Sequence, residues 1–115
     1  PYAMGAGLGE PLGDNTEQER IFVRVTRESS RADRVVRVNG DSMMPTYHDG
    51  DLLLVQETDR VSAGEIGIFI VNGEAYIKEL GNKCLISHNE AYKPIKLGSS
   101  DSVYCCGRVL GVVEE

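Results

Sequence analysis

The chain has 115 residues, of which 41% are apolar and 26% charged, a composition typical of one folded soluble domain. Its net charge of −6 argues against a domain that grips nucleic acid by itself, because phosphate contacts need clustered lysines and arginines. No apolar run approaches the roughly 20 residues of a membrane-spanning helix, which argues against a membrane-embedded protein.

The beginning of the chain differs in composition from the rest. Residues 1–13 contain four glycines and two prolines without a sustained period, which predicts a flexible leader ahead of a globular domain at residues 14–115. Because the chain begins at Pro1 rather than at Met, we expect it to be a piece of a longer protein.

From Ile21 onward the patterns are mostly those of short strands, and the Asn72-Gly73 pair between two apolar runs predicts a hairpin. Helical periodicity is limited to single turns near Met43–Tyr47 and Thr16–Arg20. The sequence therefore predicts an all-β domain of short, highly twisted sheets with a barrel-like core. The expected strands are Ile21–Val25, Val35–Val38, Leu52–Val55, Ile66–Val71, Ala75–Leu80, Cys84–Ser87, Pro94–Leu97, Val103–Cys105 and Arg108–Val113.

The cysteines and histidines do not form a recognisable ligand set. Cys84, Cys105 and Cys106 are an odd number with two adjacent members, so they make a poor disulfide framework and suit a reducing cytoplasm. Cys-x-x-Cys spacing is absent and there are only two histidines, so no metal site and no cofactor are predicted.

A first candidate for chemistry is Ser42, in the turn Gly40-Asp41-Ser42-Met43 directly after an expected strand. A serine nucleophile needs an attackable position and backbone N–H donors for the developing oxyanion, and such a turn offers both. An Asp-Ser pair in a turn is also a common structural feature, so both interpretations stand on these residues alone.

A second candidate is Lys78, which shares one face of its expected strand with Tyr76 and Leu80. Both faces of this strand carry apolar residues, so the pattern does not say which one is buried. An exposed lysine would be an ordinary surface residue. In a buried lysine, desolvation lowers the pKa and populates the neutral amine, which can take the proton of a serine hydroxyl.

A third candidate is the Ala6-Gly7 bond in the leader, where two small residues leave a peptide bond accessible. A plain linker is the alternative. The same dipeptide recurs at Ala63-Gly64, but there it lies in an expected turn and is the weaker candidate.

The neighbouring residues are assigned structural roles. Asp49 and Asp51 bracket a glycine and are typical of a turn, while His48 and His88 are expected at the surface or in turns. Met43 and Met44 could either pack under the Ser42 turn or line a groove for the leader.

In combination these motifs resemble the self-cleaving peptidase family of LexA and the phage repressors, with UmuD-like proteins among its members. The resemblance runs from about Val35 to Val113. It is carried by Gly40-Asp41-Ser42-Met43, Asp49-Gly50-Asp51-Leu52-Leu53, Tyr76-Ile77-Lys78-Glu79-Leu80, Asn89-Glu90-Ala91-Tyr92-Lys93-Pro94-Ile95 and Gly107-Arg108-Val109-Leu110-Gly111.

The resemblance implies an LexA-like peptidase fold and a self-cleaving serine endopeptidase. Ser42 would be the nucleophile and Lys78 its neutral base, with the backbone N–H groups of Asp41 and Ser42 as the oxyanion hole. Ala6-Gly7 would be the bond that is cut. Cleavage is then expected to accelerate as the pH rises, because more of Lys78 is in the base form.

The resemblance also implies partners. This C-terminal domain would form a homodimer or a higher oligomer in the bacterial cytoplasm. Operator DNA would bind only through a helix-turn-helix domain upstream of Pro1, and a RecA–single-stranded-DNA filament would stimulate cleavage. A UmuD-like accessory subunit of a lesion-bypass polymerase and a non-cleaving dimerisation module remain alternatives, and the sequence upstream of Pro1 would separate repressor from accessory subunit.

Overall fold

The structure, a computed structural model, describes residues 27–113. It confirms the all-β prediction, because these residues contain only one helix of five residues. No helix among them is long and apolar enough to cross a membrane. In chain order the elements are α1 (Arg27–Arg31), β1 (Arg34–Arg37), β2 (Leu52–Glu57), β3 (Ile66–Val71), β4 (Glu74–Leu80), β5 (Cys84–Ile86), β6 (Ile95–Lys96) and β7 (Val103–Val112).

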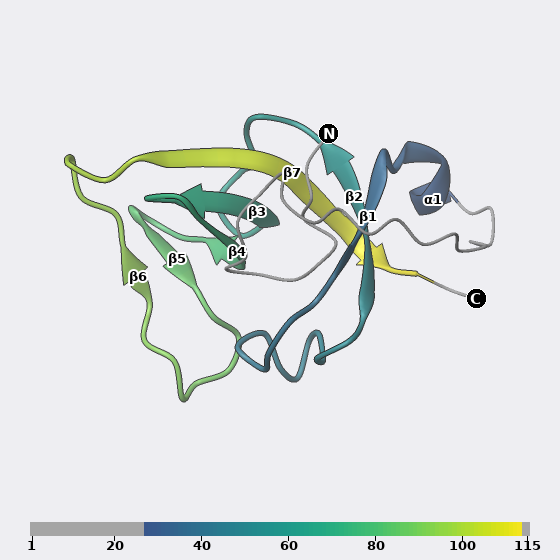
Figure 1. The fold of residues 1–115 in the computed structure, drawn as a ribbon, viewed down its shortest axis with the longest axis horizontal. Helices are drawn as coiled ribbons and strands as arrows, with labels where there is room; N and C mark the ends of the chain where they lie inside the picture. The colour runs from purple at the N-terminus through teal and green to yellow at the C-terminus, as the bar shows by residue number, and fades with distance from the viewer. Residues whose placement is uncertain (1–26, 114–115) are drawn as a thin grey trace.

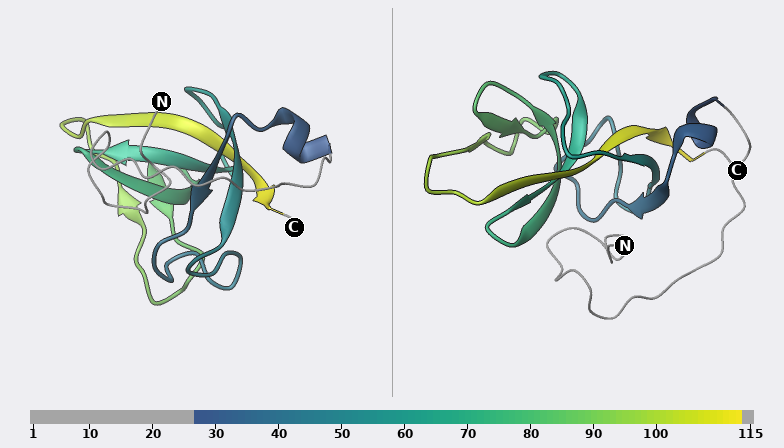
Figure 2. Two further views of the ribbon diagram at one scale, coloured as in Figure 1. Left: turned by 45° about the vertical axis from the view of Figure 1, so that its right-hand side comes forward. Right: turned by 90° about the horizontal axis from the view of Figure 1, so that it is seen from above.

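The strands form one seven-stranded sheet in the order β1-β2-β7-β3-β4-β5-β6. Every neighbouring pair is antiparallel. The longest strand, β7, lies inside the sheet between β2 and β3, and Figures 1 and 2 show it extending along both of these strands. It joins the hairpin-like pair β1–β2 on one side to β3–β4 on the other, so the last strand of the chain holds the two halves together.

Strand β7 corrects one sequence prediction, which divided this segment into two strands on either side of Cys106. The segment is one strand whose register shifts twice, and Cys106 and Leu110 are the extra residues at the shifts. Such β-bulges bend a strand and increase its twist. The interruption in the sequence pattern is therefore a bend within a strand, and Figure 2 shows the resulting curvature.

The hairpin predicted at Asn72-Gly73 is confirmed. It joins β3 to β4, and both turn residues have positive φ, 50° for Asn72 and 89° for Gly73. These angles are those of the tight hairpin turn that favours an Asn-Gly pair. The predicted single turn near residues 43–47 is also present, since Tyr47 N donates to Met43 O at 2.9 Å. The expected elements Thr16–Arg20 and Ile21–Val25 lie outside the described residues.

The core consists of two clusters of side chains on the curved sheet. The smaller cluster contains Phe69, Val71 and Leu85. The larger contains Val36, Val38, Met43, Leu53, Val55, Ile68, Ile77 and Cys106. One of its members, Met43, comes from the Ser42 turn rather than from a strand and is 1% exposed, so the turn is anchored in the core. Of the two roles considered for Met43, packing under the turn is therefore the one observed.

Candidate active site

The Ser42 turn (residues 40–46) leaves the end of β1 and is fixed at both sides of the serine. Gly40 has φ of 95°, a conformation that side chains disfavour, and its N–H donates to Asp49 Oδ1 at 2.7 Å. On the other side, Met43 is buried in the core. Ser42 itself is partly exposed, so its hydroxyl sits on a restrained turn at the rim of the core.

The structural roles predicted for Asp49 and Asp51 are confirmed. Asp49 holds Gly40, and Asp51 Oδ2 accepts from His48 N at 2.8 Å. The main chain closes the same turn, because Val38 N donates to Asp51 O and Gly50 N donates to Val38 O, both at 2.8 Å. The two carboxylates thus shape the β1–β2 connection that presents Ser42.

Lys78 lies in β4, opposite Gly67 of β3, and its side chain is buried, with only 5% of the residue exposed. Its Nζ donates a hydrogen bond to Ser42 Oγ at 2.7 Å across 36 residues of sequence. Within residues 27–113 no carboxylate forms an ion pair with it. Burial lowers the pKa of Lys78 below its ordinary value, since desolvation disfavours the ammonium form.

Two tyrosines flank the amine of Lys78. The ring centroids of Tyr76 and Tyr92 lie 5.9 and 6.0 Å from its Nζ. At this distance an aromatic face attracts a cation weakly, which opposes the effect of burial but does not replace a counter-ion. Among residues 27–113, the amine is thus in contact with one hydroxyl and lies near two aromatic rings. A serine and an amine of lowered pKa in hydrogen-bond contact can act together as nucleophile and general base.

The backbone beside Ser42 offers hydrogen-bond donors. Among residues 27–113, no hydrogen bond engages the backbone N–H of Asp41 or Ser42. Unengaged N–H groups next to a nucleophile are what stabilisation of an oxyanion requires. The structure therefore brings together Ser42, Lys78 and the two backbone groups that the sequence singled out. Ala6 and Gly7, the residues of the expected cleavage bond, lie outside the described residues.

The β5–β6 connection (residues 87–94) supplies residues to this site whose roles the sequence did not reveal. Asn89 N donates to Ser42 O at 2.9 Å, and Asn89 Nδ2 donates to Asp41 O at 3.1 Å. Tyr92 Oη donates to Asp41 Oδ1 at 2.5 Å, and this carboxylate raises the pKa of Tyr92. Figure 1 shows this connection reaching the β1–β2 connection on the same side of the sheet. Only the resemblance of residues 89–95 to the family motif pointed to them.

His88 adds a further link between the same segments. Its Nδ1 lies 2.5 Å from Thr46 Oγ1, and its Nε2 lies 2.8 Å from Glu79 Oε1. His88 is in a bend, as predicted, but it is partly buried rather than fully exposed. It connects the Ser42 turn to the residue that follows Lys78 in β4.

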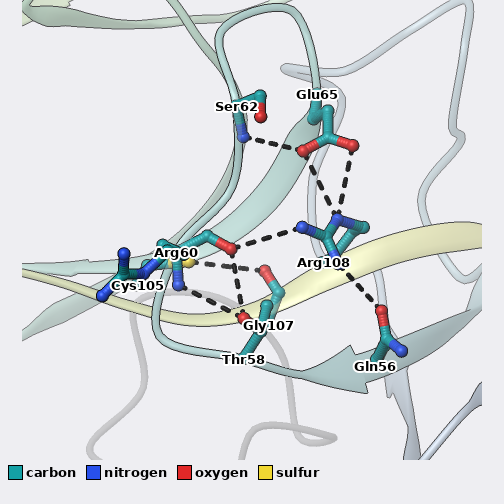
Figure 3. Close-up of polar contacts among 8 residues, drawn as sticks. All are labelled: Gln56, Thr58, Arg60, Ser62, Glu65, Cys105, Gly107 and Arg108. Atoms are coloured by element: carbon teal, nitrogen blue, oxygen red, sulfur yellow. Dashed lines mark hydrogen bonds and ion pairs between the residues drawn. The ribbon is translucent and has the colours of Figure 1, made fainter.

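A second polar cluster lies on β7 and the β2–β3 connection (Figure 3). Arg108 Nε donates to the Glu65 carboxylate at 3.3 Å, and Arg108 Nη1 donates to Gln56 Oε1 at 2.9 Å. The N–H of Ser62 donates to Glu65 Oε1 at 2.7 Å, and this bond, followed by the charge of Arg108, lowers the pKa of Glu65. These contacts fasten the β2–β3 connection to β7, which is a structural role.

The chain is similar to several known proteins. A family model described as peptidase S24-like matches residues 2–110. The LexA repressor of Aliivibrio fischeri (strain MJ11) is 35% identical over 120 residues, which cover 98% of this chain and 58% of that protein. The LexA repressor of Leptospira interrogans serovar copenhageni is 38% identical over 101 residues, covering 81% and 48%. The chain thus spans about half the length of the curated relatives it matches.

Proposed function

The chain belongs to the S24-like peptidase family, and on this basis we propose that it is the C-terminal dimerisation and self-cleavage domain of a LexA-like or prophage transcriptional repressor. Residues 14–115 would form the peptidase domain and residues 1–13 the leader that it cuts at Ala6-Gly7. The observation that carries the proposal is the contact of 2.7 Å between Lys78 Nζ and Ser42 Oγ, made by a lysine that is 5% exposed.

In the first step, the neutral amine of Lys78 takes the hydroxyl proton of Ser42 while Oγ attacks the carbonyl carbon of Ala6. The 2.7 Å contact supports this transfer, because it is within the range over which a positioned base acts. The tetrahedral intermediate carries a negative oxygen, for which the backbone N–H groups of Asp41 and Ser42 would be the donors.

In the second step, the Lys78 ammonium returns its proton to the nitrogen of Gly7, and the Ala6–Gly7 bond breaks. This leaves the carboxyl group of Ala6 as an ester of Ser42. Water, deprotonated by Lys78, hydrolyses the ester and restores the free hydroxyl. The products are a chain that ends in the carboxylate of Ala6 and a chain that begins with the amine of Gly7.

The tethered substrate makes a slow catalyst sufficient, because docking of the leader replaces a bimolecular encounter. Two controls would keep the bond intact until it is needed. One is the position of the leader, and the other is the protonation of Lys78, which removes the base. Because burial lowers the pKa of Lys78, less alkaline conditions suffice to free its lone pair than for an exposed lysine.

In the cell, the proposed cleavage would separate this domain from a helix-turn-helix domain upstream of Pro1. The domain would pair with a second copy of itself, and operator DNA would be held through the upstream domains of the homodimer. Stimulation would come from a RecA–single-stranded-DNA filament, in the bacterial cytoplasm. The relatives in Aliivibrio fischeri and Leptospira interrogans are LexA repressors, which supports the repressor role.

Intact-mass spectrometry over time at neutral and alkaline pH tests the proposal. The parent chain is expected to lose residues 1–6, whereas Ser42→Ala and Lys78→Ala keep their full mass. Matched controls are Ser62→Ala and Lys96→Ala, which change the same residue types at exposed positions and are expected to cleave like the parent. Cleavage that persists in Ser42→Ala would contradict the dyad. A folded parent that never cleaves would instead favour a module used only for dimerisation.

A further inference from the structure

Asn89 binds the Ser42 turn with its main chain and its side chain at the same time. Its backbone N–H donates to Ser42 O at 2.9 Å, and its side-chain Nδ2 donates to Asp41 O at 3.1 Å. These two carbonyls belong to consecutive peptide units, one on each side of the Ser42 Cα. A single residue of the β5–β6 connection therefore restrains both peptides that flank the candidate nucleophile.

The hydrogen bond to Asp41 O orients the whole Asp41–Ser42 peptide unit and not the carbonyl oxygen alone. A trans peptide is planar, so the carbonyl of Asp41 and the N–H of Ser42 point in opposite directions. The Asp41 carbonyl is held by Asn89 Nδ2 and also by Met44 N at 3.2 Å. Because both partners lie on the carbonyl side, the N–H of Ser42 is directed away from them, with no acceptor among residues 27–113.

Asn89 is itself held in the orientation that this role needs. Its Oδ1 accepts a hydrogen bond from Ala91 N at 2.9 Å, so the amide oxygen has a partner and the NH2 group faces the Asp41 carbonyl. Three residues on, Tyr92 Oη donates to the carboxylate of Asp41. This donor engages a negative charge that would otherwise oppose an oxyanion formed beside it.

We propose that Asn89 is a positioning residue for the oxyanion hole, which holds the Asp41–Ser42 peptide so that the Ser42 N–H faces the developing oxyanion. The inference rests on the proposed self-cleavage and adds a residue to it. Loss of one oxyanion donor slows an enzyme by about a hundredfold to a thousandfold. A donor that is loosened rather than removed should cost less, so we expect a decrease of about tenfold to a hundredfold in the rate.

The main test is Asn89→Asp, which keeps an oxygen for Ala91 N but replaces the donor to Asp41 O by an acceptor. Asn82→Asp is the matched control, because it makes the same change at an exposed position in the β4–β5 turn. Asn89→Leu, which has a similar shape and no charge, separates the loss of the donor from the added charge. Thermal unfolding of each variant shows whether the fold is retained.

Self-cleavage is measured as a function of pH for the parent and the three variants. We expect the alkaline plateau to fall in both Asn89 variants and to stay within about twofold of the parent in Asn82→Asp. The pH of half-maximal rate in Asn89→Leu should equal that of the parent, because the Ser42–Lys78 contact is intact. If Asn89 only supported the loop, its substitution would shift this midpoint, or it would lower the unfolding temperature together with the plateau rate.

Labelling of Ser42 by a fluorophosphonate provides a second readout that does not need the leader, because the phosphonyl oxygen takes the oxyanion position. The Asn89 variants should be labelled about tenfold more slowly than the parent. A parent that cleaves while folded Asn89 variants cleave and label equally fast would overturn the role of Asn89 alone. A parent that neither cleaves nor labels would overturn the proposed function and this inference together.

Discussion

Two polar clusters of this domain place a basic side chain in opposite environments. Arg108 has the Glu65 carboxylate and Gln56 as acceptors, and the side chains of Arg108 and Glu65 keep 28% and 40% of their exposure (Figure 3). Lys78 is 5% exposed, and its hydrogen-bond partner is the hydroxyl of Ser42. The two side chains project from strands that are separated by one strand, since β4 and β7 flank β3.

The environment of Arg108 favours stability, whereas the environment of Lys78 favours reactivity. A charge with a carboxylate partner and remaining water contact costs little free energy in the folded state, but the group stays in one protonation state. A buried amine without a counter-ion destabilises the fold in its charged form, and for the same reason it gives up its proton more easily. The cost at Lys78 is therefore the physical basis of the base that we propose there.

The strongest change is expected for Lys78→Met, which keeps most of the length of the side chain and removes the amine. Self-cleavage should fall by at least about a thousandfold, as for the loss of other catalytic bases. Stability at neutral pH should stay equal or rise by roughly 1 kcal/mol, because the substitution removes a buried charge that has no ion pair among residues 27–113. Intact-mass kinetics and urea unfolding measure the two effects.

Lys78 should also make the stability of the domain depend on pH. The pKa of Lys78 is lowered in the folded state, so the unfolded chain binds more protons between the folded and the ordinary pKa. The parent should therefore gain stability as the pH rises through this window, and Lys78→Met should lack that gain. Identical pH profiles for the two chains would show that Lys78 is not desolvated.

The next effect is purely structural and concerns Gly107, where β7 crosses close to β2. A Cβ at this position would lie 2.5 Å from Val55 Cγ1 and 3.2 Å from Gln56 O. Gly107→Ala should destabilise the domain by about 1–3 kcal/mol through overpacking, as measured by urea unfolding. Gly107 does not take part in the Ser42–Lys78 contact. At temperatures at which the variant is folded, the pH of half-maximal cleavage should therefore equal that of the parent. A shift in that pH would mean that the two clusters are coupled.

The smallest effect is expected for Glu65→Gln, which removes the carboxylate partner of Arg108. The pKa of Glu65 is lowered, first by the N–H of Ser62 and then by Arg108, so its contribution to stability is present above its ordinary pKa. This contribution is lost as the pH falls through the lowered pKa. The urea midpoint of Glu65→Gln should lie slightly below that of the parent at neutral pH, and the two should converge in acid. An equal gap at all pH values would contradict this origin.

The local parts of the fold were predictable because short-range signals decide them. The Asn72-Gly73 hairpin follows from the φ angles that those residues tolerate, and the strands from β2 to β5 follow from runs of apolar residues. The continuity of β7 was not predictable, because a bulge at Cys106 interrupts the alternation in the same way as a strand end.

The candidate site was predictable in part. Ser42 and Lys78 are candidates from their local patterns, and the family resemblance combines them into a dyad. The burial of Lys78 could not be derived, because its strand carries apolar residues on both faces. The contacts of Asn89 and Tyr92 with Asp41 span 48 and 51 residues. Such contacts depend on how the two connections meet in space, and local sequence patterns carry no information on that.

Whether buried Lys78 is the base that activates Ser42 can be decided by an NMR titration of its Nζ, compared with the cleavage rate at each pH. If Lys78 has this role, its amine titrates below the ordinary lysine range, and cleavage rises with the same midpoint. A Lys78 that titrates like an exposed lysine, or a cleavage rate that does not change from neutral to alkaline pH, would contradict it.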